Sequence, residues 1–182
     1  MQPAPHPNPL APATVEAAQS AGIPVYENAN GRLMEAARGA AITDVRVRNG
    51  KRESIFRSYV YPLMDRPNLT VLTNALVTRL TFRGKQAAGV EVLYGGATYN
   101  FGASVEVVLS LGAIQTPKVL MQSGIGDEAD LRRVGIDVIE HLPGVGHHFQ
   151  DHVAFDCVWE YQIPEPPRNN MSEAILFGKS LV

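Results

Sequence analysis

A run of apolar residues near the centre of the chain gives the clearest pattern in the sequence. Ser104–Leu111 is rich in Val and Leu and predicts a buried strand. It is followed by Gly112 and Ala113, whose small side chains let another group approach the backbone closely. Thr116 predicts a helix N-cap, with Pro117 at the first helical position. A strand, a glycine turn and a helix N-terminus in this order present unpaired N–H groups to an anion.

Alternation of apolar and polar residues before this run predicts an antiparallel meander. Glycines at Arg83-Gly84 and Gly95-Gly96 mark tight turns between the alternating runs. The predicted strands lie near residues 69–73, 77–82, 88–94 and 97–101.

The remaining sequence predicts short elements separated by turns, and the whole chain therefore has a mixed α/β pattern. The predicted elements are a helix that follows Thr14 and closes at Gly22, a strand over 42–48, a helix from Ser54, a helix that begins at Asp127 or Glu128 and ends at Gly135, strands over 136–142 and 153–162, and a helix-like run over 171–182.

Composition narrows the class of protein. The chain has 182 residues, of which 45% are hydrophobic, enough for one folded core. Its formal net charge of −2 gives no reason to expect a nucleic acid or an anionic membrane as partner. No apolar run is long enough to span a membrane, and the proline-rich N-terminus does not have the pattern of a secretory signal. Cys157 is the only cysteine, which is compatible with a reducing, cytoplasmic location.

The fifteen residues from Gly112 to Gly126 resemble the second signature of the glucose–methanol–choline (GMC) family of FAD-dependent oxidoreductases. That signature has a small-residue start, a Thr/Ser-Pro pair, two aliphatic residues and a Ser-Gly-aliphatic-Gly end. The matching positions are Gly112, Ala113, Thr116, Pro117, Leu120, Met121, Ser123, Gly124, Ile125 and Gly126. The resemblance implies the middle portion of an FAD/NAD(P)-binding-type domain over residues 1–150 and the start of an antiparallel-sheet substrate domain over 151–182.

The resemblance also implies FAD as cofactor and a set of residues that contact it. Gly112 and Ala113 would lie against the cofactor, and the backbone of Val77 would touch its adenine end. Residues 143–152 are similar to a Pro-Gly-Val-Gly…Gln-Asp-His segment of the family, so Asp151 and His152 would line the flavin cavity. His148 and Phe149 stand where Asn-Leu is common, and no role of that Asn is carried over.

Two parts of the family pattern are absent from this sequence. The G-x-G-x-x-G turn that holds a dinucleotide pyrophosphate is not found, and no residue matches the catalytic His of the family. The sequence thus resembles a central fragment of an enzyme that oxidises the CH–OH group of a small alcohol, choline-like or aryl/alkyl, by hydride transfer to flavin. We expect no catalytic residue here, little FAD binding or turnover by the chain alone, an exposed apolar edge at 104–110, and dependence on the missing remainder.

Other functions fit parts of the same sequence. A metal site at His147, His148, Asp151 and His152 is disfavoured because adjacent histidines on an extended loop point apart, and we predict no metal. Cys157 has no nearby base in the sequence and is interpreted as a small hydrophobic residue. The alternative to an enzyme fragment is a non-catalytic α/β remnant, which binds a partner or nothing.

Overall fold

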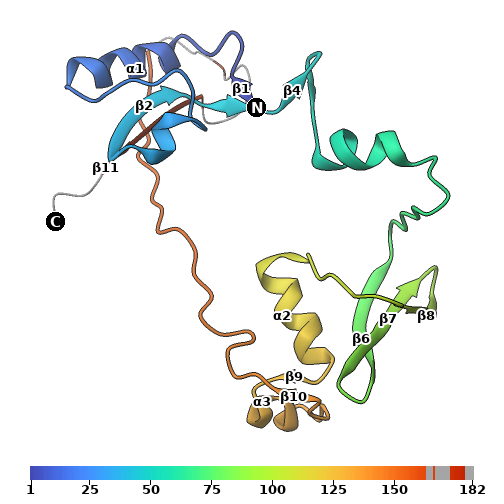
Figure 1. Ribbon diagram of the computed structural model, residues 1–182. Coiled ribbons are helices and arrows are strands. Elements are labelled where there is room, and N and C mark those ends of the chain that lie inside the picture. The colour runs from blue at the N-terminus through green and yellow to red at the C-terminus, as the bar shows by residue number, and fades with distance from the viewer. Residues whose placement is uncertain (163–165, 167–172, 179–182) are drawn as a thin grey trace. The chain divides into compact units, whose positions relative to one another are not determined.

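The computed structural model describes residues 1–162, 166 and 173–178, which form two compact units (Figure 1). The first unit combines Met1–Leu69 with the segment that begins at Cys157, and the second consists of Thr70–Asp156. The fold is mixed α/β with small sheets, most of them antiparallel. No helix in the described part of the chain is long and apolar enough to cross a membrane.

A three-stranded antiparallel meander forms the sheet of the second unit. It consists of β6 (Leu76–Arg83), β7 (Gln86–Tyr94) and β8 (Ala97–Gly102), in that spatial order. Gly95 and Gly96 have φ values of +57° and +83°, which side chains disfavour, and they make the second turn. Three of the predicted strands and both turns are confirmed. The predicted strand over 69–73 is wrong, because these residues form no ladder.

Helix α2 (Gly112–Gln122) packs beside β6, and Val119 is its buried residue. The helix begins before the predicted N-cap, so the prediction of a start at Thr116 and Pro117 is wrong. The Thr116 hydroxyl instead accepts a hydrogen bond from the Leu111 N–H at 3.0 Å, from inside the second turn. Pro117 lies within the helix, where it removes the N–H that would bond to the carbonyl of Ala113.

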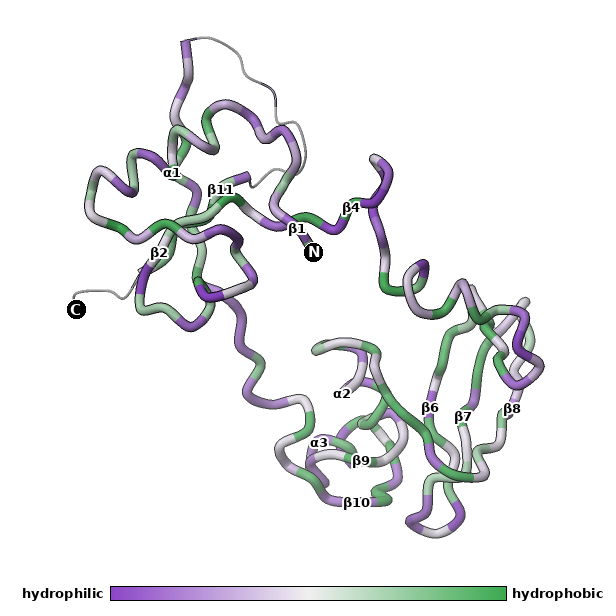
Figure 2. Tube along the Cα trace, turned by 45° about the horizontal axis from the view of Figure 1, so that its top comes forward, coloured by the Kyte–Doolittle hydropathy of each residue, from purple (hydrophilic) through white to green (hydrophobic). Residues whose placement is uncertain are grey.

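The stretch between β8 and α2 is not the buried strand that its apolar residues predict. Figure 1 draws it as a nearly straight connection without an arrow, and Figure 2 colours it as hydrophobic. Val105 is 92% exposed and Val108 is 72% exposed, whereas Val107 and Leu109 are half-buried. A strand needs a neighbouring strand to pair with, and the described residues supply none for this stretch.

A short helix and a parallel strand pair follow α2. Strand β9 (Ile125–Gly126) pairs in parallel with β10 (Glu140–His141), so the predicted strand over 136–142 is reduced to two residues. Between them lies α3 (Glu128–Arg133), capped by Asp127, whose carboxylate accepts hydrogen bonds from the Ala129 and Asp130 N–H groups. The predicted acid-first helix is confirmed, and Gly135, with φ +74°, ends it.

In the first unit, helix α1 packs against a two-stranded antiparallel sheet (Figure 2). The sheet consists of β2 (Arg38–Ile42) and β11 (Ala174–Gly178), and α1 covers Leu10–Ser20. The predicted helix over 171–182 is therefore wrong for residues 174–178, which form a strand paired with β2, far away in the sequence. The start predicted at Thr14 is also wrong: the Asn8 side chain accepts a hydrogen bond from the Leu10 N–H at 2.8 Å and begins the helix earlier.

The other elements of this unit are short. The 3₁₀ turn η1 (Arg32–Glu35) adds Leu33 to a small core with Ala29, Ala41 and Tyr26. The predicted strand over 42–48 is divided into β3 and β4, and a helical segment does follow Ser54. These elements are β1 (Gln2–Pro3) with β3 (Asp44–Val45), β4 (Val47–Arg48) with β5 (Lys51–Arg52), and the helical turns η2 (Phe56–Val60) and η3 (Tyr61–Leu63).

The predicted half-buried strand over 153–162 is wrong. These residues form no strand, and their apolar side chains are exposed, with Val153 at 101% and Trp159 at 81%. Cys157, interpreted as a buried hydrophobic residue, is exposed as well. The alternating pattern is present, but among the described residues neither face of this stretch is covered.

Candidate functional site

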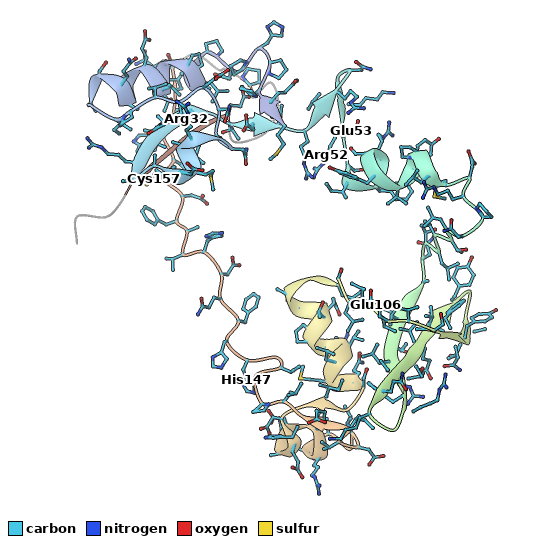
Figure 3. The ribbon with its side chains drawn as sticks, in the orientation of Figure 1. Arg32, Arg52, Glu53, Glu106, His147 and Cys157 are labelled. Atoms are coloured by element: carbon cyan, nitrogen blue, oxygen red, sulfur yellow. The ribbon has the colours of Figure 1, made fainter. Side chains whose placement is uncertain are left out.

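A cleft of about 650 Å³ lies within the second unit, between α2 and the loop that follows β10. Figure 3 marks His147 on this loop. One wall comes from the first three turns of α2, and the other from residues 144–150. The lining residues are Ala113, Ile114, Thr116, Pro117, Leu120, Met121, Gly144, Val145, Gly146, His147, His148, Phe149 and Gln150.

The start of α2 brings backbone donors and an acceptor to one wall of the cleft. Gly112 has φ +86°, and a Cβ added there would meet no atom within 4 Å, so the turn is open as well as left-handed. The first N–H groups of a helix have no partner one turn earlier in the helix. Because Pro117 has no N–H, the carbonyl of Ala113 lacks its usual helical donor as well. A polar ligand can therefore bond to main chain at this wall.

The opposite wall is a loop with two residues in left-handed conformation. Gly146 has φ +80°, and an added Cβ would lie 3.1 Å from the Sδ of Met121 on α2. A side chain at this position would therefore adopt a strained conformation and require the end of the flexible Met121 side chain to move by a few tenths of an ångström. His148 has φ +59°, an uncommon conformation for a residue other than glycine. The loop thus follows a specific path that keeps it close to α2.

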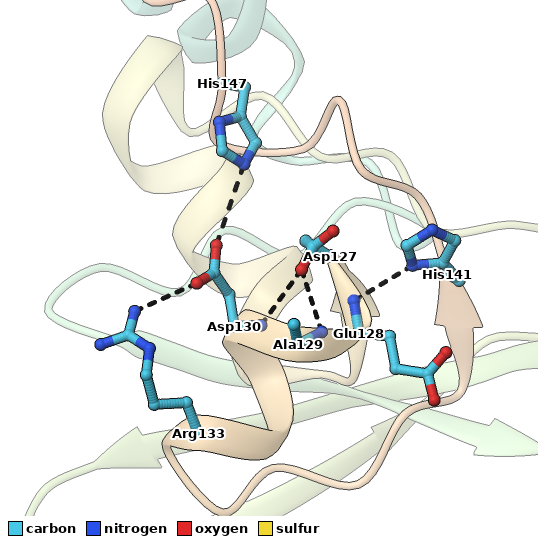
Figure 4. Close-up of polar contacts among 7 residues, drawn as sticks. All are labelled: Asp127, Glu128, Ala129, Asp130, Arg133, His141 and His147. Atoms are coloured by element: carbon cyan, nitrogen blue, oxygen red, sulfur yellow. Dashed lines mark hydrogen bonds and ion pairs between the residues drawn. The ribbon is translucent and has the colours of Figure 1, made fainter.

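The loop is also connected to α3 (Figure 4). The Nε2 atom of His147 lies 3.9 Å from a carboxylate oxygen of Asp130, whose other oxygen pairs with Arg133 at 3.1 Å. The N–H of Glu128 donates to Nδ1 of His141 at 3.1 Å, which links the start of the helix to β10. The His147 contact is an ion pair only when the imidazole is protonated. These contacts attach the cleft wall to the folded body of the unit.

The structure brings some of the predicted site residues together. Ala113 lines the cleft, and Gly112 precedes it as an exposed residue at the start of α2. Asp151 and His152 directly follow the lining loop and are exposed, and the Asp151 carboxylate accepts the N–H of His152 at 2.7 Å. Val77 lies outside the cleft, half-buried on β6 opposite Val92 of β7. The cofactor roles given to all five residues stay predictions.

Several lining residues were not singled out as site residues from the sequence. The signature predicts Leu120 and Met121 only as its apolar pair, and Phe149 only as a departure from the family pattern. Gly146 gave a signal, since a glycine in a Pro-Gly-Val-Gly turn often allows close approach of another group. Contact between such distant segments, however, is a property of the tertiary structure.

The histidine-rich loop does not converge on a common point. The rings of His147 and His148 are 6.3 Å apart between centroids and tilted by 56°. Within residues 1–162, 166 and 173–178, no three His, Cys, Asp or Glu side chains are grouped closely enough to hold a metal ion.

Comparison with known proteins gives a consistent set of relatives. The sequence model of the GMC oxidoreductase family matches residues 2–154. The chain is 44% identical to human mitochondrial choline dehydrogenase over 146 residues, which is 80% of this chain and 24% of that enzyme. It is 40% identical over 162 residues to the oxygen-dependent choline dehydrogenase of Citrobacter koseri, covering 87% of this chain and 28% of the relative.

Solved structures give the same result. Pyridoxine 4-oxidase from Mesorbium loti superposes with a TM-score of 0.67 and 31% identity, over 74% of this chain and 26% of that one. An FAD-dependent oxidoreductase from Chaetomium thermophilum has a TM-score of 0.65 and 34% identity, over 75% and 24%. The chain therefore spans about a quarter of the length of the relatives it matches.

Proposed function

Because the chain belongs to the GMC oxidoreductase family, we propose that it forms part of the flavin site of an FAD-dependent enzyme that oxidises the CH–OH group of a small alcohol. The resemblance at Gly112–Gly126 is thereby confirmed at the level of the family. The activity and the cofactor are our proposal for this chain, which corresponds to only about a quarter of each relative.

The observation that carries the proposal is the cleft between α2 and loop 144–150. Its volume of about 650 Å³ is in the range of pockets that hold small organic ligands. One wall offers backbone groups at the start of α2, and the side chains of Leu120 and Met121 add an apolar surface. Open space at Gly112 leaves room for a ligand beside the main chain. This combination fits FAD, which has both a flat apolar ring system and an anionic pyrophosphate.

Each predicted site residue has a role in this proposal. Gly112 and Ala113 leave the first two positions of α2 without bulky side chains, so that the cofactor lies against the backbone there. Asp151 and His152, which follow the lining loop, extend its polar wall. Val77 contacts the adenine end through its backbone; β6 is an edge strand of its sheet, so main-chain groups on its outer side are available.

The reaction follows from the cofactor. FAD, when bound, supplies the redox chemistry of alcohol oxidation, and the protein positions it and excludes water. We assign no catalytic residue to this chain. We propose a choline-like alcohol as the substrate, because the curated relatives with 39–44% identity include several choline dehydrogenases.

A graft into a relative tests the proposal directly. Residues 2–154 of this chain would replace the corresponding part of human choline dehydrogenase. We expect the purified chimera to contain stoichiometric FAD, measured by absorbance after release from the denatured protein, and to oxidise choline. The unmodified human enzyme and the enzyme with this part deleted are the controls.

A chimera that is folded and soluble but free of FAD would contradict the proposal. That result would favour the alternative, a non-catalytic α/β remnant. A chimera with bound FAD that oxidises another small alcohol but not choline would overturn the proposed substrate and leave the proposed cofactor site intact.

A further inference from the structure

A short hairpin in the first unit places two cations directly opposite each other. Strands β4 and β5 are joined by Asn49 and Gly50, whose φ values of +51° and +71° fit a type I′ turn. Next to this turn the register pairs Arg48 with Lys51. Residues that are directly opposite in an antiparallel pair have side chains on the same face, with Cβ atoms about 5 Å apart. The turn therefore holds two positive charges close together.

A third cation lies on the same face of the hairpin. The Glu53 N–H donates to the Arg46 carbonyl at 2.8 Å, which extends the pairing beyond β4 and β5. Because side chains alternate along a strand, Arg46 and Glu53 lie on the same face as the first pair. The carboxylate of Glu53 accepts a hydrogen bond from the Ser58 hydroxyl at 3.1 Å. We call the face formed by Arg46, Arg48, Lys51 and Glu53 the cationic face.

The cations of this face have no partner that compensates their charge. All three are exposed, and none forms an ion pair with a residue in the described part of the chain. Like charges that are directly opposite in a sheet destabilise it, so the pairing of Arg48 with Lys51 has a cost in the free chain. The net charge of −2 for the whole chain does not show this local excess.

The cationic face also has room for a ligand beside it. Arg46 and Arg48 line a hollow of about 870 Å³ within the first unit, to which Tyr59 of η2 contributes as well. An anion bound at the face would reduce the repulsion between the cations, and the hollow would hold the rest of the molecule that carries the anion.

We infer that the cationic face binds a phosphate group. The guanidinium of Arg48 suits a phosphate because it can donate two parallel, charge-assisted hydrogen bonds, and the ammonium of Lys51 binds the same group as a point charge. A free phosphate compound and a phospholipid headgroup both offer this group. The face shares no residue with the cleft of the second unit, so the inference is independent of FAD binding.

Titration of the full 182-residue chain with two probes tests this inference. Inorganic pyrophosphate represents free phosphate compounds, and the shifts of the amides of residues 48–52 in nuclear magnetic resonance spectra give its Kd. Vesicles of phosphatidylcholine with phosphatidylglycerol represent the lipid, and their binding is measured by co-sedimentation, with vesicles of phosphatidylcholine alone as the blank. Both titrations are made at one ionic strength, because salt screens exposed charges.

A matched pair of variants separates this face from unspecific attraction to positive charge. Arg48→Gln removes one member of the opposed pair, and we expect it to weaken binding about tenfold. Arg83→Gln is the control, because Arg83 is also exposed beside a two-residue turn but is paired with the neutral Gln86. We expect the control to bind like the natural chain.

A third variant shows that any loss of binding is not a loss of structure. Lys51→Glu places opposite charges across the ladder, which stabilises a sheet. We expect this variant to lose the binding while the Glu53 N–H, which bonds to Arg46, becomes better protected from hydrogen exchange than in the natural chain.

The two probes identify the source of the phosphate. Binding of pyrophosphate that Arg48→Gln weakens would support a site for a free phosphate compound, and the same sensitivity with vesicles alone would support a lipid headgroup. Binding of neither probe, equal affinities of Arg48→Gln and Arg83→Gln, or undiminished binding by Lys51→Glu would overturn the inference. A chimera without FAD would count only against the proposed cofactor cleft.

Discussion

The two ends of the Gly112–Gly126 signature have opposite surroundings. At the first end, Gly112 is exposed and has open space around the position of its missing side chain. At the other end, Gly124 is buried, and a Cβ there would overlap the carbonyl oxygen of Asp137. Both glycines have φ above +80°, so both are left-handed, and only their neighbours differ.

The signature therefore has two parts, one that can receive a ligand and one that connects elements of the fold. The second end connects elements: the Gly124 carbonyl accepts the N–H groups of Ile139 and Glu140, and β9 then pairs with β10. The first end contacts little and lies beside the cleft. One half of the signature therefore holds α2 in the fold, and the other half is free to receive a ligand.

The largest effect is expected from alanine at the two glycines. Gly124→Ala should destabilise the second unit by about 3 kcal/mol, because it adds left-handed strain and a clash with main chain. Gly112→Ala should cost about 1 kcal/mol, since only the strain applies there. Hydrogen exchange of amides in β6 and β7 measures the stability of this unit. Equal costs at the two positions would show that their surroundings do not differ as described.

A smaller effect is expected at Ser123, which belongs to the buried end. Its hydroxyl accepts the N–H of Leu80 at 2.8 Å and donates to the Val119 carbonyl at 2.5 Å, so it joins α2 to β6. Ser123→Ala leaves the buried Leu80 N–H without this partner and should cost about 2 kcal/mol. Ser110→Ala, at an exposed position, is the control and should change the same amide exchange little. A cost at Ser123 no larger than at Ser110 would refute the proposed link.

The smallest effect concerns an exposed pair on the meander. The pKa of Glu91 is lowered from its ordinary value of 4.5 because its carboxylate accepts hydrogen bonds from Arg79 and Thr78. The pKa of Glu91 is lower in the folded state than in the unfolded state. The ionised Glu91 side chain therefore stabilises the fold at any pH above the unfolded-state pKa, and this stabilisation is lost as the pH falls through the folded-state pKa.

Glu91→Gln should therefore be slightly less stable than the natural chain at neutral pH, with a difference that shrinks in acid. The difference in the free energy of unfolding between the two chains is measured by urea unfolding at neutral and at acid pH, followed by circular dichroism. High salt should reduce this difference further, because it screens the ion pair. A difference that grows in acid would contradict the assigned direction.

The elements predicted correctly are those whose signals are local. The turns of the meander depend on adjacent residues such as Gly95 and Gly96, and the cap of α3 depends on Asp127 and the N–H groups just beyond it. In both cases the interacting groups are only a few residues apart, so the sequence contains the whole interaction.

The elements predicted wrongly depend on distant partners. Residues 174–178 form β11 because β2 lies beside them. Residues 104–111 form no strand because no strand in the described part of the chain lies beside them. The start of α2 was misplaced for a different reason: a Thr-Pro pair favours a helix start, yet the Thr116 hydroxyl bonds back to Leu111 from inside the helix.

The candidate site was predictable in part for the same reasons. Ala113 came from the signature and does line the cleft, while the contact between Met121 and Gly146 requires the loop to fold back over α2. The two residues can be read from the sequence, but nothing local in the sequence shows that they lie side by side in the fold.

The most direct test of the cleft as the flavin site adds the same bulk inside it and outside it. In the chimera with human choline dehydrogenase, Ala113→Phe would fill the cleft, whereas Lys118→Phe adds the ring at an exposed position of α2 that does not line it. We expect the Ala113→Phe chimera to purify folded but without FAD and the Lys118→Phe chimera to keep its FAD. Full FAD content in the folded Ala113→Phe chimera would contradict this expectation.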